Sequence, residues 1–281
     1  AAQALKKTRL AALSTAAIAD AARLVEAGFF FIADYFSPFT PPERRYSALD
    51  SGSDRNFEGG TMLICQEMFL LLTKDNGKKE DWVSNNEAAL RATVLADLLL
   101  GGHVELAEKK KVVTTTQRPK NPVLAWAWEE LQQRKTASTK ELLEASWFTP
   151  REIIALDFHA NGQLDIEKAK WWQWGGDRYI MTDLELEHQL RERLVAVLEA
   201  QRPAEVNDVI ILDILREVSG AYTLLKNDAE GMKRREMRAR IQEIKKEVTY
   251  DKTASSAVKA VVEEAAAVAA VVATSAAITT T

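Results

Sequence analysis

The spacing of apolar residues along most of this chain is that of amphipathic helices. Segments 87–100, 186–201 and 233–247 place apolar side chains every three or four residues. Residues 205–220 are apolar on nearly every side, which is typical of a helix at the centre of a domain. The pattern predicts a mainly α fold, in which a central apolar helix bundle is ringed by amphipathic helices and short β-hairpins connect some of them.

Three stretches predict turns between strands. Asn76-Gly77, in KDNGKK, is a tight-turn signal and predicts a short strand pair. Residues 103–116 alternate like a second hairpin, with Lys109, Lys110 and Lys111 at its tip. Residues 163–183 predict a strand and a two-stranded wing that turns at Gly175-Gly176.

The residues at the start of the helix predicted near Ser84 suit ligand binding as well as packing in a core. Ser84 and Glu87 form a capping-box pattern, and Gly101 is expected to end the helix in the left-handed conformation. Free N–H groups at a helix start attract anions, Trp82 flanks this start, and Arg91 leans back toward it. A phosphorylated headgroup fits such a corner. The alternative is that Glu87 already fills the positive end, Trp82 staples the helix and Arg91 is a solvated charge.

Composition separates an N-terminal extension from a folded domain and limits the class of protein to which the chain belongs. Residues 1–60 read as an N-terminal extension and linker of unknown role, because a basic alanine-rich stretch gives way to a Pro-, Ser- and Gly-rich one, and the folded domain is predicted over 61–281. The single Cys65 predicts a buried thiol and a cytosolic, reducing location. The net charge of −4 does not attract nucleic acid or anionic lipid by itself.

The alanine-rich tail is the one segment long enough to be considered for a membrane span. It carries Lys259, Glu263 and Glu264, and each charge at bilayer depth would cost about 3 kcal/mol on an insertion scale. We therefore expect a soluble or packing helix there.

No catalytic constellation stands out. The chain has no glycine-rich phosphate loop, no histidine pair at metal spacing and no Gly-x-Ser-x-Gly motif, so we expect neither an enzyme nor a metal or other cofactor. Asp97 and Asp213 are attributed to turns or solvated faces.

A winged-helix nucleic-acid binder is the alternative from a different class. The predicted wing is accompanied by basic residues and by three tryptophans that could stack on bases: Lys168, Lys170, Arg178, Arg191 and Arg193, with Trp171, Trp172 and Trp174. Acidic residues interleave with these bases, so the surface is mixed rather than positive. No nucleic acid is therefore expected as a partner.

The line MFLLLTKDNGKKEDWVSNNEAALRATVLADLLLGGHVEL resembles the opening of the Golgi phosphoprotein 3 family, and weaker similarity runs from about Met62 to the end of the chain. In eukaryotic members a Trp and an Arg nine residues apart bind the headgroup of phosphatidylinositol 4-phosphate. Trp82 and Arg91 have this spacing and stand at the matching points. The resemblance implies that Trp82 and Arg91 bind a lipid headgroup.

Two departures from the family pattern affect the implied site. The family has two further headgroup arginines three residues apart; Arg151 matches one, while Phe148 stands at the other position, either beside the pocket or as a core residue. The hairpin with Lys109, Lys110 and Lys111 is shorter and more basic than the family's apolar hairpin, which enters the membrane or contacts a second subunit. These lysines are either a membrane contact or a solvated turn.

The resemblance implies a non-enzymatic adaptor at the membrane periphery. Its implied partners are a phosphoinositide-containing membrane surface, the cytosolic tails of membrane enzymes such as Golgi glycosyltransferases, and a second copy of the chain. It implies a role in vesicle trafficking and a cytoplasmic, peripheral membrane location, at the Golgi if the source is eukaryotic.

Overall fold

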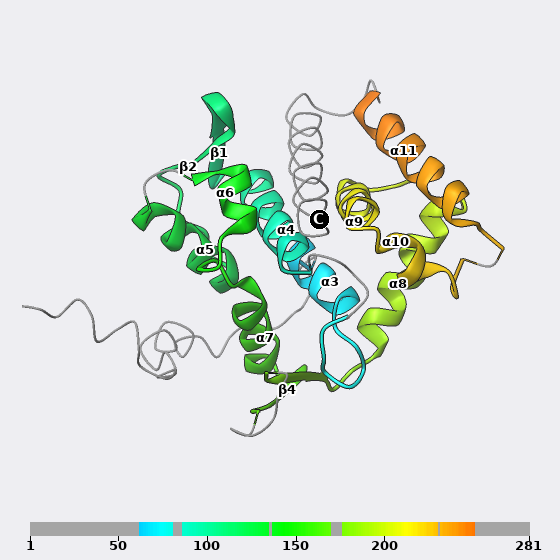
Figure 1. Ribbon diagram of the computed structural model, residues 1–281, viewed down its shortest axis with the longest axis horizontal. Helices are drawn as coiled ribbons and strands as arrows, with labels where there is room; N and C mark the ends of the chain where they lie inside the picture. The colour runs from blue at the N-terminus through cyan, green and yellow to red at the C-terminus, as the bar shows by residue number, and fades with distance from the viewer. Residues whose placement is uncertain (1–61, 81–85, 135–136, 170–175, 230, 251–281) are drawn as a thin grey trace, which may run out of the picture. The chain divides into compact units, whose positions relative to one another are not determined.

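The computed structural model describes residues 62–80, 86–134, 137–169, 176–229 and 231–250, and everything below concerns these residues (Figure 1). In chain order their elements are α3 (Ile64–Leu71), α4 (Asn86–Leu100), β1 (Val104–Ala107), η2 (Glu108–Lys110), β2 (Lys111–Thr114), α5 (Pro122–Gln133), β3 (Ala137–Ser138), α6 (Thr139–Glu144), α7 (Pro150–Ala160), β4 (Leu164–Glu167), β5 (Arg178–Met181), α8 (Glu185–Leu198), α9 (Val206–Glu217), α10 (Ala221–Leu225) and α11 (Arg234–Tyr250). The predicted mainly α class with short hairpins is confirmed.

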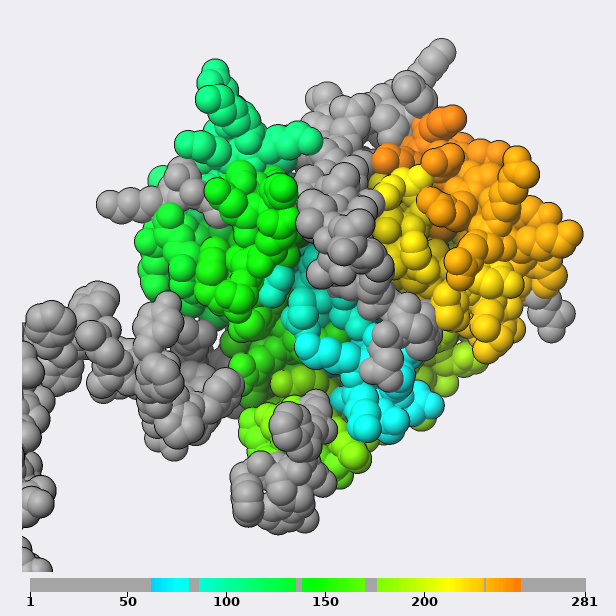
Figure 2. Space-filling model, in the orientation of Figure 1, coloured from blue at the N-terminus to red at the C-terminus, as the bar shows by residue number. Residues whose placement is uncertain are grey.

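Helix α4 forms the centre of the helical body. Every residue from Ala88 to Leu99 is buried, and the helix packs against α3, α5, α6, α7 and α9. Helix α9 is buried from Asp208 to Leu215, as its all-round apolar pattern predicts. In Figure 1, α5, α6 and α7 lie on one side of α3 and α4, and α8 to α11 on the other, and Figure 2 shows the cyan surface of α3 and α4 between these green and yellow-to-orange groups.

The carboxyl end of α4 is closed by a glycine one position later than predicted. The amide of Gly102 donates to the carbonyl of Leu99 at 3.0 Å, and that of His103 donates to the carbonyl of Leu98 at 2.9 Å. This is the Schellman arrangement, and its left-handed residue is Gly102, with φ +66°, rather than Gly101. The prediction for Gly101 was wrong because the helix continues to Leu100.

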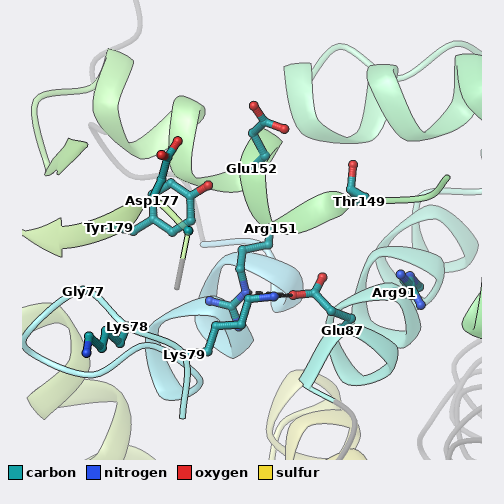
Figure 3. Close-up of a pocket in the computed structure, with 11 residues that line it drawn as sticks. Gly77, Lys78, Lys79, Glu87, Arg91, Thr149, Arg151, Glu152, Asp177 and Tyr179 are labelled. Carbon is teal, nitrogen blue, oxygen red and sulfur yellow. Dashed lines mark hydrogen bonds and ion pairs between the residues drawn. The ribbon is translucent and has the colours of Figure 1, made fainter. Parts of the chain in front are cut away.

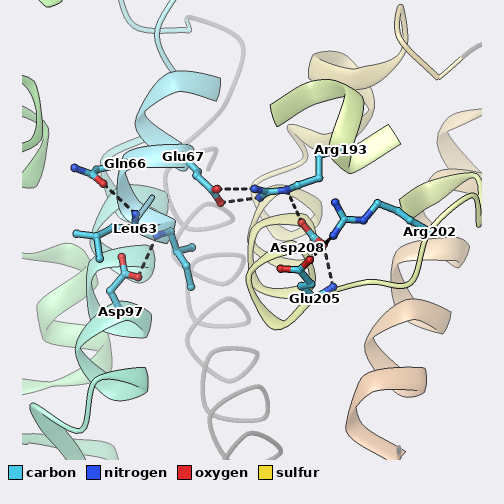
Figure 4. Close-up of polar contacts among 9 residues, drawn as sticks. Leu63, Gln66, Glu67, Asp97, Arg193, Arg202, Glu205 and Asp208 are labelled. Carbon is cyan, nitrogen blue, oxygen red and sulfur yellow. Dashed lines mark hydrogen bonds and ion pairs between the residues drawn. The ribbon is translucent and has the colours of Figure 1, made fainter. Parts of the chain in front are cut away.

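A carboxylate from the last turn of α4 caps α3. Asp97 accepts hydrogen bonds from the backbone amides of Ile64 at 3.1 Å and Cys65 at 2.9 Å (Figure 4). Burial raises the pKa of Asp97 to about 7, although the two amide bonds act in the opposite direction. Asp97 and Asp213 are both buried, so the attribution of these residues to turns or solvated faces was wrong, whereas the predicted buried thiol of Cys65 is confirmed.

The strands form two small antiparallel sheets. Strands β1, β2 and β3 make one, in which Val104 faces Thr114, and β4 pairs with β5 in the other, in which Leu164 faces Met181. The hairpin predicted for 103–116 is therefore confirmed, and so is a strand pair in the predicted wing, whose turn at Gly175-Gly176 lies partly outside the described residues. The KDNGKK segment forms a tight turn closed by one bridge between Thr73 and Lys79, not the predicted strand pair.

None of the helices in the described residues is both long enough and apolar enough to cross a bilayer. The predicted N-terminal extension, the alanine-rich tail, and the tryptophans of the wing lie outside these residues.

Candidate functional site

A cavity of about 380 Å³ opens at the amino end of α4. Four segments form its walls: the KDNGKK turn, the first two turns of α4, the start of α7, and β5 with the residues before it (Figure 3). These segments are far apart in the sequence. The volume falls in the range of small-molecule sites, which is about 300–1,000 Å³.

Gly77 joins the turn to β5 and so closes one side of the cavity. It has φ +75°, and its carbonyl accepts a hydrogen bond from the amide of Tyr179 at 2.9 Å. A Cβ at this position would lie 2.8 Å from the nitrogen of Tyr179. Any other residue would be strained and would push the turn away from β5, so glycine is required by both conformation and space.

Arg151, in the first turn of α7, is buried and held on three sides. Its Nη1 donates to Oγ1 of Thr73 at 3.0 Å, and its Nη2 donates to the carbonyl of Leu72 at 3.3 Å. Its Nε donates to Oε1 of Glu87 at 3.1 Å, as the dashed line in Figure 3 shows. The guanidinium also lies over the ring of Phe69, with 5.4 Å from Cζ to the centroid. Burial lowers the pKa of Arg151, and the charge of Glu87 opposes that shift.

Arg91 lies in the second turn of α4 and is also largely buried. Its Nε donates to the carbonyl of Phe148 at 2.7 Å, and its Nη1 donates to the carbonyl of Leu143 at 2.8 Å. The side chain thus ties α4 to the segment that leads into α7. Burial lowers the pKa of Arg91, and the charge of Glu87 opposes this shift too.

Glu87 lies between these arginines and a lysine. Its Oε1 accepts hydrogen bonds from Nζ of Lys79 at 2.5 Å and from Nε of Arg151 at 3.1 Å. Burial by itself would raise the pKa of Glu87, but the hydrogen bond from Lys79 and the charge of Arg151 outweigh it and hold that pKa below its usual value. The carboxylate is therefore ionised at neutral pH.

The opposite wall carries further polar groups. Glu152, Asp177 and Tyr179 line the cavity, and Lys78 lies exposed at its edge. Asp177 accepts hydrogen bonds from Nζ of Lys168 and from the backbone amide of residue 169. Burial, with the nearby charges of Glu152 and Asp177, raises the pKa of Tyr179 to about 12, so its phenol stays neutral.

Phe148 does not face this cavity. Its side chain is fully buried and stacks on Trp126, with ring centroids 5.0 Å apart, and it meets Trp147 edge-on at 5.5 Å. Only its carbonyl takes part in the site, as the acceptor for Arg91. Of the two interpretations given for Phe148, the structure supports the core residue.

The structure thus brings together two of the three predicted headgroup residues. Arg91 and Arg151 lie on one cavity, whereas Trp82 is outside the described residues. Sequence reasoning missed the roles of Lys79, Gly77 and Tyr179. The Asn76-Gly77 turn gave a local signal, but nothing in the spacing indicates that β5 lies against it.

Lys109, Lys110 and Lys111 lie far from this cavity along α4, on the hairpin that follows its carboxyl end. All three are exposed, and the hairpin projects from the helical body (Figures 1 and 2). Lys109 and Lys110 have φ of 60° and 56°, so two consecutive left-handed residues make the turn.

The basic residues of the winged-helix alternative are engaged with acidic groups. Arg193 forms ion pairs with buried Glu67 and Asp208, at 2.7 and 2.8 Å (Figure 4). Arg191 pairs with Glu187 at 2.6 Å, and Lys168 pairs with Asp177. The phosphodiesters of a nucleic-acid backbone carry one negative charge each, as a carboxylate does, so cations already paired with carboxylates gain little from them and this surface does not suit nucleic acid. Lys170 lies outside the described residues.

Among the described residues, no three His, Cys, Asp or Glu side chains gather as a metal site would require. None of the curated proteins matches the chain significantly. The family model described as Golgi phosphoprotein 3 (GPP34) matches residues 64–265, which is most of the sequence and includes every wall of the cavity. The chain therefore belongs to the Golgi phosphoprotein 3 family.

Proposed function

We propose that this chain is a peripheral membrane adaptor that binds the phosphorylated headgroup of phosphatidylinositol 4-phosphate in the cavity at the amino end of α4. The observation that carries the proposal is the convergence of Arg91 and Arg151, from two helices, on one cavity in a member of this family. Guanidinium groups suit phosphate because their donors are fixed, charged and paired in one plane.

The cavity offers both kinds of group that an inositol phosphate requires. Lys78, Lys79 and the two arginines provide positive charge for the phosphate, while carboxylate and phenol oxygens on the opposite wall suit ring hydroxyls. Trp82 precedes α4 by four residues, and we propose that it lies beside the bound headgroup at the membrane interface, where tryptophan is enriched.

The remaining parts of the proposal concern partners and location. Lys109, Lys110 and Lys111 add a second attraction to anionic lipid, at about 1 kcal/mol for each lysine near such a surface. The protein cargo would be the cytosolic tails of membrane enzymes, held at the Golgi in a eukaryotic source during vesicle trafficking. A second copy of the chain is a further proposed partner.

Sedimentation with vesicles tests the headgroup site. Vesicles of phosphatidylcholine with phosphatidylinositol 4-phosphate should bind the wild type, and Trp82→Ala and Arg91→Ala should each weaken that binding. Because Arg91 also ties α4 to residues 143 and 148, its variant needs a thermal melt to show that it is folded. Lys78→Ala gives a test without this complication, since Lys78 is exposed.

The control is Lys226→Ala, which removes the same charge from an exposed position on another part of the surface. It should bind these vesicles as the wild type does. If Lys78→Ala, Arg91→Ala and Trp82→Ala all bind as well as Lys226→Ala, the cavity is not the headgroup site.

A further inference from the structure

One feature of the cavity does not suit a simple anion site. Its two best-placed cations already share an anion, because Lys79 and Arg151 both donate to the same oxygen, Oε1 of Glu87. Two cationic donors that converge on one oxygen are what a bound phosphate oxygen would receive. In this structure a carboxylate of the chain itself takes that place.

We propose that Glu87 is a built-in competitor, and that a phosphate-bearing ligand binds by displacing its carboxylate from Lys79 and Arg151. This inference rests on the proposed headgroup site and adds how that site is regulated and which phosphates it selects. The selected class is the phosphomonoester, and the rejected class is the phosphodiester.

When a ligand replaces Glu87, most contacts of Arg151 stay in place. Its Nη1 and Nη2 stay bound to Thr73 and Leu72, so only the Nε edge changes partner. The guanidinium is already held in place, so little side-chain order has to be gained when the ligand arrives. The side chain of Lys79 is 54% exposed and can turn toward a ligand without unfolding anything.

Glu87 can leave because it is only partly buried. Its side chain is 28% exposed, whereas that of Arg151 is 5% exposed. A displaced carboxylate can therefore be hydrated, but an Arg151 without a counter-ion cannot. The buried arginine needs an anion at all times, and the ligand must supply it when Glu87 does not.

The charge of a ligand determines whether it can displace the carboxylate of Glu87. A phosphodiester carries one negative charge, as Glu87 does, so the exchange gains no net charge attraction. A phosphomonoester carries a charge of about −1.5 to −2 near neutral pH and offers three acceptor oxygens. It can accept hydrogen bonds from Lys79 and Arg151 and still interact with Arg91, which already interacts electrostatically with Glu87.

The test compares wild type with Glu87→Gln, which keeps the shape of the side chain and removes its charge. Vesicles of phosphatidylcholine carry either phosphatidylinositol 4-phosphate, which has a phosphomonoester, or phosphatidylinositol, which has only a phosphodiester. Glu87→Gln should bind the first kind about tenfold more tightly than wild type, the size of one charge-assisted contact. It should also bind the second kind more tightly than wild type does.

The matched control is Glu129→Gln. Glu129 pairs with Arg118 at 2.7 Å on the surface of α5, so this variant also removes one carboxylate and frees one arginine, but away from the cavity. It should bind both kinds of vesicle as wild type does. An equal gain in both variants would mean that net charge, not displacement, sets the affinity, and would overturn the inference.

A second measurement separates this inference from the proposed function. Inorganic phosphate at pH 8 should raise the melting temperature of Glu87→Gln more than that of wild type. If it does so while neither protein sediments with vesicles, the result supports displacement of Glu87 by phosphate and rejects the proposed membrane function. If wild type binds vesicles through Lys78 and Glu87→Gln binds no better than wild type, the function stands and the inference falls.

If neither wild type nor Glu87→Gln binds phosphate or vesicles, both proposals fail. A melt of each variant shows whether it is folded. If Glu87→Gln does not fold, Glu87→Asp replaces it, because a side chain one methylene shorter keeps its charge but no longer reaches both cations. The same gain in phosphomonoester binding is expected, and its absence in a folded Glu87→Asp overturns the inference.

Discussion

The two ends of α4 carry positive side chains in opposite circumstances. At the amino end, Arg91 and Arg151 are buried, and each makes two or more hydrogen bonds to the protein. Beyond the carboxyl end, Lys109 to Lys111 are exposed, and their ammonium groups form no hydrogen bond or ion pair within the described residues. The ends are separated by a helix of 15 residues, or roughly 22 Å.

This difference distinguishes specific recognition of a ligand from non-specific attraction to a charged surface. A buried arginine has a fixed position and a fixed set of donors, so it can select a ligand by shape and charge, and it also supports the fold. An exposed lysine is flexible and hydrated, so it contributes attraction that depends on salt and on the charge of the surface it meets. Mutations at the two ends should therefore have different effects.

The largest effect is expected for Phe148→Arg, at the amino end. Because Phe148 is fully buried against Trp126, an arginine there would lose its packing and bury a charge without a partner. The free energy of unfolding should fall by about 3–5 kcal/mol or more, which a thermal or denaturant melt would detect. Phe148→Leu is the control, with an expected loss of about 1.5 kcal/mol or less. A folded Phe148→Arg with normal stability and tighter vesicle binding would show that position 148 reaches the cavity.

A smaller loss is expected for Arg151→Ala. This change removes the donors to Leu72 and Thr73 and leaves Glu87 with Lys79 alone, so the free energy of unfolding should fall by about 3 kcal/mol. Arg178→Ala is the comparison, because Arg178 is 46% exposed and lies 3.9 Å from Glu167. That variant should change stability by about 0.5 kcal/mol or less. Equal melting of the two variants would mean that burial does not distinguish these arginines.

The smallest change in stability is expected at the hairpin. Replacing Lys109, Lys110 and Lys111 by alanine should change the free energy of unfolding by less than about 1 kcal/mol, since the side chains are exposed. Binding to anionic vesicles should weaken by about 1 kcal/mol for each lysine at low salt, and the loss should shrink as salt rises.

The control for the hairpin replaces three other exposed cations, Lys233, Arg235 and Arg238, by alanine. It removes the same charge from the first half of α11 and from the residue that precedes this helix. If this control weakens vesicle binding as much as the hairpin variant does, the hairpin is a solvated turn and the attraction belongs to the whole surface.

Local sequence determined the elements of this protein. The apolar period predicted α4 as a helix and α9 as a buried helix, and the alternation around the lysines predicted the hairpin of β1 and β2. These features follow from interactions between residues a few positions apart, which a sequence displays directly. Even there the end of α4 was placed one residue early, because Gly101 and Gly102 are equally able to adopt the left-handed conformation.

Tertiary structure alone decided how the candidate site is assembled. No spacing in the sequence indicates that Glu87 meets Arg151, 64 positions later, or that Gly77 lies against Tyr179. Nor does it choose between core and cavity for Phe148, since an aromatic residue at the start of a helix suits either. Such pairings depend on which helix faces pack together, because burial makes an arginine require a partner and packing decides which carboxylate provides it. The sequence by itself therefore determined which residues bear charge, and the packing of α3, α4, α7 and β5 decided which of those charges meet.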